Sequence, residues 1–342
     1  MQLSPGKLMG MKRLSGCNGI FLMTAVDQRP PIKNPIRDHL KVSEAPWQEV
    51  AKFKRALIDS LQEYSSALLL DPHFALPFSM DIFDPRKGLV VTLEDSAFIE
   101  TKNGRISKNI DDWSVSKIKR MGADAVKVLA WYRPDADKEV LKQQKDYIQR
   151  VGEDCAKYDI LFLLELLVYP LPKLTDESQT TEYKEMKNKK TEHVFRSIEE
   201  FAKEKYRVDI FKLESPVNAE LIDRDDLDTF KEMGRIAARP WVMLSAGVSK
   251  AEFKKVLSLA FQAGCSGFLA GRAIWLEALA NYPDWEKINT VLRGSSATYL
   301  SEIVSLAEQQ AMPWHKHECF TKGGNLFPYK TAKFRHLYME ND

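Results

Sequence analysis

Short apolar runs alternate with segments of helical periodicity along most of the chain. Because a buried strand of a parallel sheet is apolar on both faces, such runs predict β-strands. We predict eight strands, at 19–26, 66–70, 88–93, 125–129, 160–167, 208–213, 241–244 and 267–270. Helical spacing of apolar residues covers 47–64, 115–121, 135–158, 219–238 and 250–263, and 278–310 is mostly helical. The alternation predicts an α/β fold, and a closed (β/α)8 TIM barrel more readily than an open doubly wound sheet.

Three stretches interrupt this pattern. Pro30 and Pro31 follow the first strand closely, and we expect a loop there instead of a helix. Residues 71–87 are rich in Pro and Phe and show no clear helix, and 175–190 are polar and predict a surface loop that leads into a helix ending near Tyr206. We assign 1–311 to the barrel domain. The polar, aromatic-rich residues 312–342 are an irregular C-terminal extension, either an appendage on the barrel or an oligomer contact.

Composition narrows the classes of partner. The chain has 342 residues, 44% hydrophobic and 29% charged, which is typical of a globular protein. The net charge of +2 favours neither a nucleic acid nor an anionic membrane as partner. No apolar run is long enough to span a bilayer, and the N-terminus lacks a signal-peptide pattern. The four cysteines are widely spaced without a CxxC, which indicates free thiols, so we expect a cytoplasmic protein.

One lysine interrupts the sixth predicted strand. Lys212 lies in VDIFKLESPVN at 208–218, among strand-forming residues. Burying an unpaired ammonium group is costly. Either Lys212 points outward and its ammonium group reaches solvent, or it is a desolvated amine that can attack a carbonyl and form a Schiff base.

Other charged residues lie at equivalent places on neighbouring strands. Asp27 ends the first predicted strand, and Lys127 and Glu165 interrupt the fourth and fifth. Catalytic groups of a (β/α)8 barrel sit at the carboxyl ends of the strands, so we expect these side chains to meet Lys212 there. A second lysine would disfavour protonation of Lys212, and a carboxylate could carry protons. The alternative is an ion-pair network that only holds the barrel together. Glu214 should point to the same side as Lys212, and we assign it no role.

Glycine-containing turns follow the last two strands. Ser245-Ala246-Gly247 follows the seventh, and Gly271-Arg272 follows the eighth. Barrel enzymes bind a substrate phosphate here through backbone N–H groups at helix N-termini, and Arg272 would add a charged contact. The alternative is that the glycines only form tight turns. The chain has neither a GxGxxG after the first strand nor a GxxxxGK[ST], so we expect no nucleotide cofactor.

Histidine placement gives little support for a metal. Only His73 of the six histidines lies near a predicted strand end. The tail residues His315, His317 and Cys319 could contribute zinc ligands, but such a site needs about four and no matching second pair is present. We predict no metal site and interpret this cluster as part of a polar surface.

Seven segments occur in an order that resembles a known family. They are TAVDQR at 24–29, LLLDP at 68–72, GADAVKVLAWY at 122–132, LFLLELLVY at 161–169, DIFKLESPVN at 209–218, LSAGVS at 244–249 and LAGRAIW at 269–275. Together they resemble the class I tagatose-1,6-bisphosphate aldolases, with the sulfofructose-phosphate aldolases as relatives, over roughly residues 14–310. The resemblance implies a Schiff-base lyase that needs no cofactor. It would cleave a ketohexose 1,6-bisphosphate into dihydroxyacetone phosphate and glyceraldehyde 3-phosphate.

The resemblance also implies a role for each matching residue. Lys212 would form the imine with Lys127 beside it, and Glu165 would transfer protons. Asp27 would hold the lysine pair and the substrate hydroxyls. The phosphate site would be Ser245, Ala246, Gly247, Gly271 and Arg272, with Gln28 and Arg29 at the mouth, toward the second anionic group. The chain departs from the family pattern at Pro30-Pro31 and in LESP at 213–216, which concerns the distal end of the substrate.

Three other functions stay open at this point. The first is a Schiff-base aldolase for a sulfonated or deoxy sugar phosphate, for example sulfofructose 1-phosphate. The second is a non-enzymatic metabolite-binding barrel, although binding alone needs no nucleophile. The third is a metal-dependent aldolase, which the few histidines near strand ends disfavour. In the preferred interpretation the partner is a small sugar phosphate, and we expect a homo-oligomer, either a dimer or a tetramer.

Overall fold

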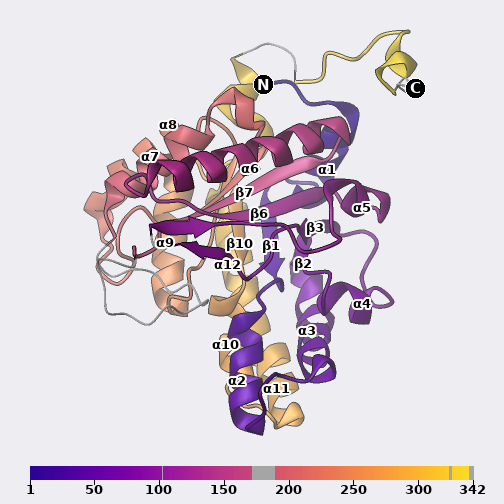
Figure 1. Ribbon diagram of the computed structural model, residues 1–342, viewed down its shortest axis with the longest axis vertical. Coiled ribbons are helices and arrows are strands. Elements are labelled where there is room, and N and C mark those ends of the chain that lie inside the picture. The colour runs from indigo at the N-terminus through magenta and orange to yellow at the C-terminus, as the bar shows by residue number, and fades with distance from the viewer. Residues whose placement is uncertain (102, 172–188, 323–325, 339–342) are drawn as a thin grey trace.

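Eight parallel strands close into a barrel in the computed structural model, which describes residues 1–101, 103–171, 189–322 and 326–338 (Figure 1). The strand order around the barrel is β1-β10-β9-β8-β7-β6-β3-β2. The strands are β1 (Phe21–Ala25), β2 (Ala67–Leu70), β3 (Gly88–Thr92), β6 (Ala125–Trp131), β7 (Leu161–Leu167), β8 (Ile210–Leu213), β9 (Trp241–Met243) and β10 (Gly267–Ala270). Each strand coincides with a predicted run, although β6 extends two residues beyond the predicted 125–129, and the predicted (β/α)8 barrel is confirmed.

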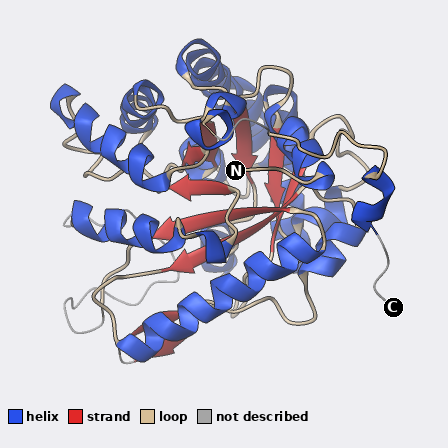
Figure 2. Ribbon diagram, turned by 90° about the horizontal axis from the view of Figure 1, so that it is seen from above, coloured by secondary structure: helices blue, strands red, loops and turns tan. Residues whose placement is uncertain are grey.

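Helices surround the strands (Figure 2). The main ones are α3 (Trp47–Leu61), α5 (Val115–Arg120), α6 (Lys138–Lys157), α7 (Thr191–Phe201), α8 (Leu227–Ala237), α9 (Lys250–Gln262), α10 (Arg272–Leu279), α11 (Trp285–Val291) and α12 (Ala297–Gln310). The stretch 71–87 holds only the short helix α4 (Ala75–Ser79). A two-stranded hairpin, β4 (Ile99–Thr101) and β5 (Gly104–Ile106), follows β3. Most of the predicted surface loop 175–190 lies outside the described residues.

The prediction of a loop at Pro30-Pro31 is wrong. Helix α2 (Pro30–Leu40) begins there, with the two prolines in its first turn. A proline at the first helical position costs nothing, because its missing N–H would have no partner in the helix and its φ already suits the helix. Strand β1 therefore connects to α2 through residues 26–29 alone, which holds Asp27, Gln28 and Arg29 in a short connection.

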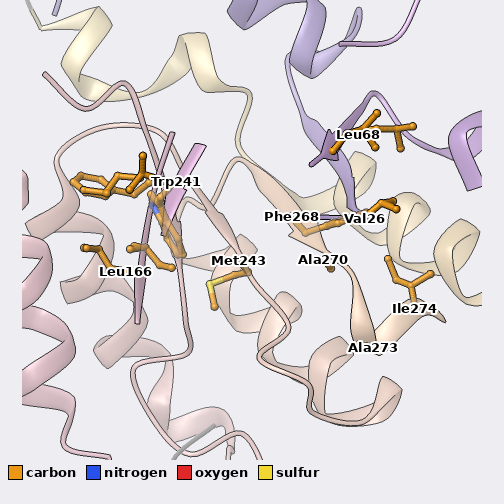
Figure 3. Packing of buried hydrophobic residues seen from close by; sticks show 14 of the residues in the cluster. Val26, Leu68, Leu166, Trp241, Met243, Phe268, Ala270, Ala273 and Ile274 are labelled. Carbon is orange, nitrogen blue, oxygen red and sulfur yellow. The ribbon is translucent and has the colours of Figure 1, made fainter. Parts of the chain in front are cut away.

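Alternate residues of each strand face opposite sides of the barrel wall. The outward set packs against the helices. Figure 3 shows part of it, with Leu68, Leu166, Trp241, Met243, Phe268 and Ala270 of the strands and Ala273 and Ile274 of α10. The inward set forms a separate buried cluster: Phe21, Met23, Ala25, Ala67, Leu69, Val90, Ala125, Leu161, Leu163, Ile210, Val242 and Leu269. The interior of the barrel is thus a packed apolar core.

Both ends of the chain close this core at the amino ends of the strands. Helix α1 (Pro5–Ser15), which the apolar pattern did not predict, contributes Met11 and Leu14, and the C-terminal segment contributes Trp314 and Phe320. The indole of Trp314 donates a hydrogen bond to Ser15 Oγ at 3.0 Å. Gly10 lets α1 approach the barrel, because a Cβ there would lie 2.8 Å from the Leu161 side chain and 2.9 Å from the Asp124 carbonyl. The start of the C-terminal extension is therefore part of the barrel floor.

No helix in the described parts of the chain is long and apolar enough to cross a membrane. The division of the chain into a barrel domain at 1–311 and a C-terminal extension at 312–342 remains a prediction.

The floor of the barrel should contribute strongly to stability. Trp314 is 3% exposed, so Trp314→Ala should lower the free energy of unfolding by about 3 to 5 kcal/mol, because it removes a buried indole and leaves a cavity. Phe334→Ala is the control, since Phe334 is 42% exposed, and it should change stability by less than about 0.5 kcal/mol. Urea denaturation measures both, and equal small changes would contradict a structural role for the tail.

Candidate active site

The charged residues continue the inward-facing rows of the barrel. Asp27 lies two residues beyond Ala25, Lys127 two beyond Ala125, Glu165 two beyond Leu163, and Lys212 two beyond Ile210. Since side chains alternate along a strand, all four point into the lumen above its apolar core. The prediction that they meet at the carboxyl ends of the strands is confirmed. They line one pocket with Gln28, Arg29, Pro30, Pro31, Glu94, Asp95, Ser96, Leu129, Trp131, Leu167, Leu244, Ser245, Ala246, Leu269, Gly271 and Arg272.

One carboxylate oxygen lies between the two lysines. Glu165 Oε2 is 2.9 Å from Lys212 Nζ and 2.9 Å from Lys127 Nζ. Glu165 and Lys212 are paired in register on the adjacent strands β7 and β8. All three side chains are buried, so the ion pairs form in a medium that screens them poorly. Glu165 therefore lies in direct hydrogen-bond reach of the amine that would act as nucleophile.

The two lysines differ in their carboxylate partners. Lys127 Nζ is also 2.9 Å from Asp27 Oδ2 and 2.6 Å from Glu94 Oε1, whereas Glu165 is the carboxylate partner of Lys212 among the described residues. Burial lowers the pKa of Lys127, but the carboxylates of Asp27, Glu165 and Glu94 raise it by more, so it lies well above its ordinary value. Lys127 is accordingly held as an ammonium group.

The carboxylates beside these lysines stay ionised. Burial raises the pKa of Asp27, but the positive charges of Lys127 and Lys212 lower it by more, so it lies below its usual range. Burial likewise raises the pKa of Glu165, but the positive charges of Lys127 and Lys212 lower it by more, so the net shift is downward. Both carboxylates can therefore accept a proton or hydrogen bond from a bound hydroxyl.

The chain matches known proteins over nearly its full length. The DeoC/LacD family aldolase domain matches residues 21–277. The chain is 32% identical to a tagatose 1,6-diphosphate aldolase of Listeria innocua, covering 92% of this chain and 95% of that protein. It is 35% identical to tagatose 1,6-diphosphate aldolase 2 of Enterococcus faecalis, covering 89% and 98%. The chain belongs to the DeoC/LacD aldolase family.

Solved structures agree on the fold of this aldolase. A fructose-bisphosphate aldolase from Plasmodium falciparum superposes with a TM-score of 0.67 at 14% identity, covering 91% of this chain and 97% of that one. A Schiff-base-forming fructose-1,6-bisphosphate aldolase gives a TM-score of 0.56 at 14% identity, covering 88% and 99%. At this identity the likeness shows the fold alone.

The glycine turns of this aldolase lie where the sequence predicted, with one difference. Ser245, Ala246, Gly271 and Arg272 line the pocket, whereas Gly247 is exposed and outside the lining. Gly247 has a φ of +81°, and a Cβ there would lie 3.2 Å from the Arg272 guanidinium carbon, so the glycine leaves space for that side chain. A Cβ on Gly271 would lie 2.7 Å from the Ala25 carbonyl oxygen and 2.8 Å from Gln28 Nε2. Gly271 thus lets β10 and the β1–α2 connection approach each other.

Arg29 is buried in the site, although the sequence placed it at the mouth. It is 5% exposed, and its Nη2 donates to the Glu94 carbonyl oxygen at 3.0 Å. Its Nε and Nη1, together with Asp27 Oδ1 and Gln28 Oε1, are buried without a hydrogen-bond partner in the described residues. Buried polar atoms are nearly always paired, so these four atoms on one connection indicate a polar ligand.

Sequence reasoning missed Glu94. Its carboxylate accepts hydrogen bonds from Lys127 and, at 2.7 Å, from the hydroxyl of Thr92. It lies two residues beyond Thr92, the last residue of β3, so the alternation that places Lys127 also places Glu94 inward. The predicted strand 88–93 ended one residue before it. An acidic residue directly after an apolar strand was the available signal.

Glu214 lies outside the pocket lining and contacts its surroundings. It accepts a hydrogen bond from the Val168 N–H at 2.7 Å, and Lys189 Nζ is 3.4 Å from its other oxygen. These contacts connect the carboxyl ends of β7 and β8.

The described residues contain no group of three or more His, Cys, Asp or Glu side chains arranged to hold a metal ion. His317 Nδ1 instead accepts the Cys319 N–H at 3.3 Å. Since Trp314 is at the barrel floor, these tail residues lie at the end of the barrel opposite the pocket.

The buried charge cluster should make stability depend on acidic pH. The folded-state pKa of Asp27 lies below its unfolded value, so the unfolded chain binds the extra proton and stability falls as pH drops below about 4. Between pH 5.5 and 2.5 the wild type should lose about 2 kcal/mol more than Asp27→Asn, measured by urea denaturation at each pH. Parallel pH curves for the two proteins would contradict the ionised, paired state of Asp27.

Proposed function

We propose that the protein is a class I aldolase that cleaves tagatose 1,6-bisphosphate into dihydroxyacetone phosphate and glyceraldehyde 3-phosphate through an imine on Lys212. The observation that carries this proposal is the position of Glu165 Oε2, 2.9 Å from the amine of Lys212 and 2.9 Å from that of Lys127. Schiff-base cleavage requires a nucleophilic amine and a proton carrier, and a cation beside a lysine is one way to disfavour protonation of its amine.

The proposed reaction begins with attack of the neutral Lys212 amine on the C2 carbonyl of the open-chain sugar. Before the attack, Glu165 accepts one proton from the Lys212 ammonium group, which makes the amine neutral. Glu165 then returns this proton to the hydroxyl of the carbinolamine, which leaves as water and gives an iminium ion. Glu165 next removes the C4 hydroxyl proton, the C3–C4 bond breaks, and its electron pair moves into the iminium to give an enamine. Glyceraldehyde 3-phosphate leaves. Glu165 returns the C4 hydroxyl proton to the enamine at C3, and water hydrolyses the resulting iminium ion, which releases dihydroxyacetone phosphate and restores Lys212.

The cationic residues suit a substrate with an anionic group at each end. Arg272 begins α10 and lines the pocket with Ser245, and its guanidinium lies close to Gly247. We assign the C1 phosphate to these turns, because helix N–H groups and a guanidinium both bind anions. Arg29 extends from β1 to the backbone at Glu94 after β3, away from the β9–β10 edge. We assign the distal phosphate to its two unpartnered nitrogens. Lys212, on β8, supplies the nucleophile to the carbon chain between them.

One alternative substrate is favoured by a specific observation. The free Nε and Nη1 of Arg29 would bind a sulfonate as well as a phosphate, so a sulfofructose 1-phosphate is the second candidate. We further propose that the enzyme is cytoplasmic, acts without a metal or organic cofactor, and assembles as a homo-oligomer.

Borohydride trapping tests the nucleophile. With dihydroxyacetone phosphate present, reduction should add the mass of the reduced adduct to the peptide that contains Lys212, as measured by mass spectrometry. Lys212→Met should lose trapping and lower kcat by at least about a thousandfold, since the covalent route is removed. Lys254→Met is the control, because Lys254 lies on the exterior and pairs with Glu302, and it should keep both. Trapping and cleavage by Lys212→Met would refute the assignment.

A substrate panel tests the two anionic ends and the metal-dependent alternative. Cleavage of tagatose and fructose bisphosphates and of sulfofructose phosphate should be insensitive to EDTA. Arg29→Met should raise KM for the preferred substrate at least about tenfold, because a charged hydrogen-bonding partner is lost, and should change kcat less. A variant with an unchanged KM would remove Arg29 from the distal site, and loss of activity with EDTA would support a metal-dependent aldolase.

A further inference from the structure

A second ion pair lies behind the pocket. Lys54 of α3 and Asp71, which follows β2, are 2.5 Å apart between Nζ and Oδ2, and both side chains are 0% exposed. Neither residue lines the pocket. Removing two charges from water costs several kcal/mol per ion, and an apolar pair of similar volume often stabilises a protein as well or better. Stability alone is therefore a weak reason for an ion pair at this place.

The contacts of the pair tie two strand ends together. Lys54 Nζ donates to the Val26 carbonyl oxygen at 2.6 Å as well as to Asp71. The other oxygen of Asp71 accepts the backbone N–H groups of His73 and Phe74, each at 2.9 Å, so the loop after β2 holds the carboxylate in place. One ammonium group thus connects the ends of β1 and β2 to helix α3.

The contact with Lys54 affects the site because Val26 directly precedes Asp27. Register pairing of β1 with β2 ends at Ala25, and Val26 is the first residue beyond it. The Val26 carbonyl belongs to the peptide group that leads into Asp27, so its direction sets where the Asp27 side chain starts. The side chain then reaches Lys127, with 2.9 Å between Asp27 Oδ2 and Lys127 Nζ. Helix α2 begins only three residues after Asp27, at Pro30, so the connection is short.

We propose that Lys54 and Asp71 are positioning residues of the aldolase, which hold the connection of Asp27, Gln28 and Arg29 against the reacting lysines. Neither residue lines the pocket or pairs with Lys127 or Lys212, and the pair acts through the Val26 peptide. An apolar pair would fill the same volume but would leave that carbonyl without its ammonium donor. The inference rests on the proposed function, because it assumes that Asp27 and Arg29 act on the substrate.

The molecule contains a matched control. Lys7 of α1 and Asp209 form another buried ion pair, 2.7 Å apart, with side chains 11% and 3% exposed. Asp209 also accepts the Phe162 N–H at 2.8 Å, as Asp71 accepts backbone N–H groups. This pair lies near the amino ends of the strands, far along the barrel axis from the pocket. The same substitutions therefore remove a buried pair at each end of the barrel.

The experiment compares Lys54→Met/Asp71→Asn with Lys7→Met/Asp209→Asn in the full chain. Each double variant removes both charges and leaves an amide that can still accept the backbone N–H groups. The Lys54 variant should lower kcat/KM for tagatose 1,6-bisphosphate at least about tenfold, because small misplacements of catalytic groups have effects of that size. The Lys7 variant should change kcat/KM by less than about twofold, whatever it does to the thermal unfolding temperature.

A cycle with Asp27→Asn separates positioning from general damage. If the pair acts through Asp27, adding Lys54→Met/Asp71→Asn to Asp27→Asn should slow borohydride trapping at Lys212 by less than about twofold. Losses that multiply, a folded Lys54 variant with wild-type kcat/KM, or an equal loss in the Lys7 variant would each overturn the proposal. If the Lys54 variant does not fold by circular dichroism, Lys54→Met/Asp71→Leu, which fills the site with apolar groups, takes its place under the same criteria.

The proposed function has its own readout. Trapping at Lys212 in the wild type and cleavage of the bisphosphate are measured first. Their absence contradicts the aldolase mechanism, whereas their presence with any of the overturning results contradicts only the role of Lys54 and Asp71.

Discussion

The structure depends on the neutralisation of two buried lysines by carboxylates inside a closed barrel. Lys127 and Lys212 would each be costly to bury as isolated cations, and their shared contact with Glu165 makes them tolerable. Asp27 and Glu94 form further ion pairs with Lys127 alone. This asymmetry distinguishes Lys127, a fixed cation, from Lys212, the proposed nucleophile. In the proposed mechanism, transfer of a proton from Lys212 to Glu165 removes one positive and one negative charge together, so the net charge of the cluster does not change.

The barrel makes this arrangement possible by dividing its interior along the axis. Near the amino ends of the strands the inward residues are apolar, and α1 and Trp314 seal them from solvent. Two residues further along the same rows, Lys127 and Lys212 face inward above that core. The apolar floor leaves the ammonium groups no water on one side, so their partners must be protein carboxylates or a bound substrate. The cost of charge burial is thus concentrated at the carboxyl ends of the strands.

Around the pocket, backbone approach controls where the polar groups sit. Gly271 lets β10 contact the Ala25 carbonyl and Gln28, and the Lys54 ammonium group holds the Val26 carbonyl from the other side. The first two residues of α2 are prolines with a fixed φ, so the connection that carries Asp27 and Arg29 has little freedom. Unpartnered atoms on this connection are consistent with a site that is preformed for a polar ligand.

The sequence by itself determined the strand pattern and most of the charged set. Buried strands of a barrel are apolar on both faces, so Lys127, Glu165 and Lys212 stood out as exceptions within apolar runs. Helix α1 could not be found in the same way, because it packs through close approach at Gly10 and not through a regular apolar stripe. The helix at Pro30 was missed because the rule against proline applies to the interior of a helix. In the first turn the backbone N–H groups have no partner within the helix, so proline is tolerated there.

Only the tertiary structure decided which charges pair. Asp27 and Glu94 follow β1 and β3, and Glu165 lies in β7. Closure of the barrel brings all three to Lys127 while leaving Lys212 with Glu165. The same closure buried Arg29, left two of its nitrogens without a hydrogen-bond partner among the described residues, and brought Lys54 of a surrounding helix to the Val26 carbonyl. Pairing depends on strand order and register across residues far apart in the chain, and the order of amino acids along one strand does not contain that information.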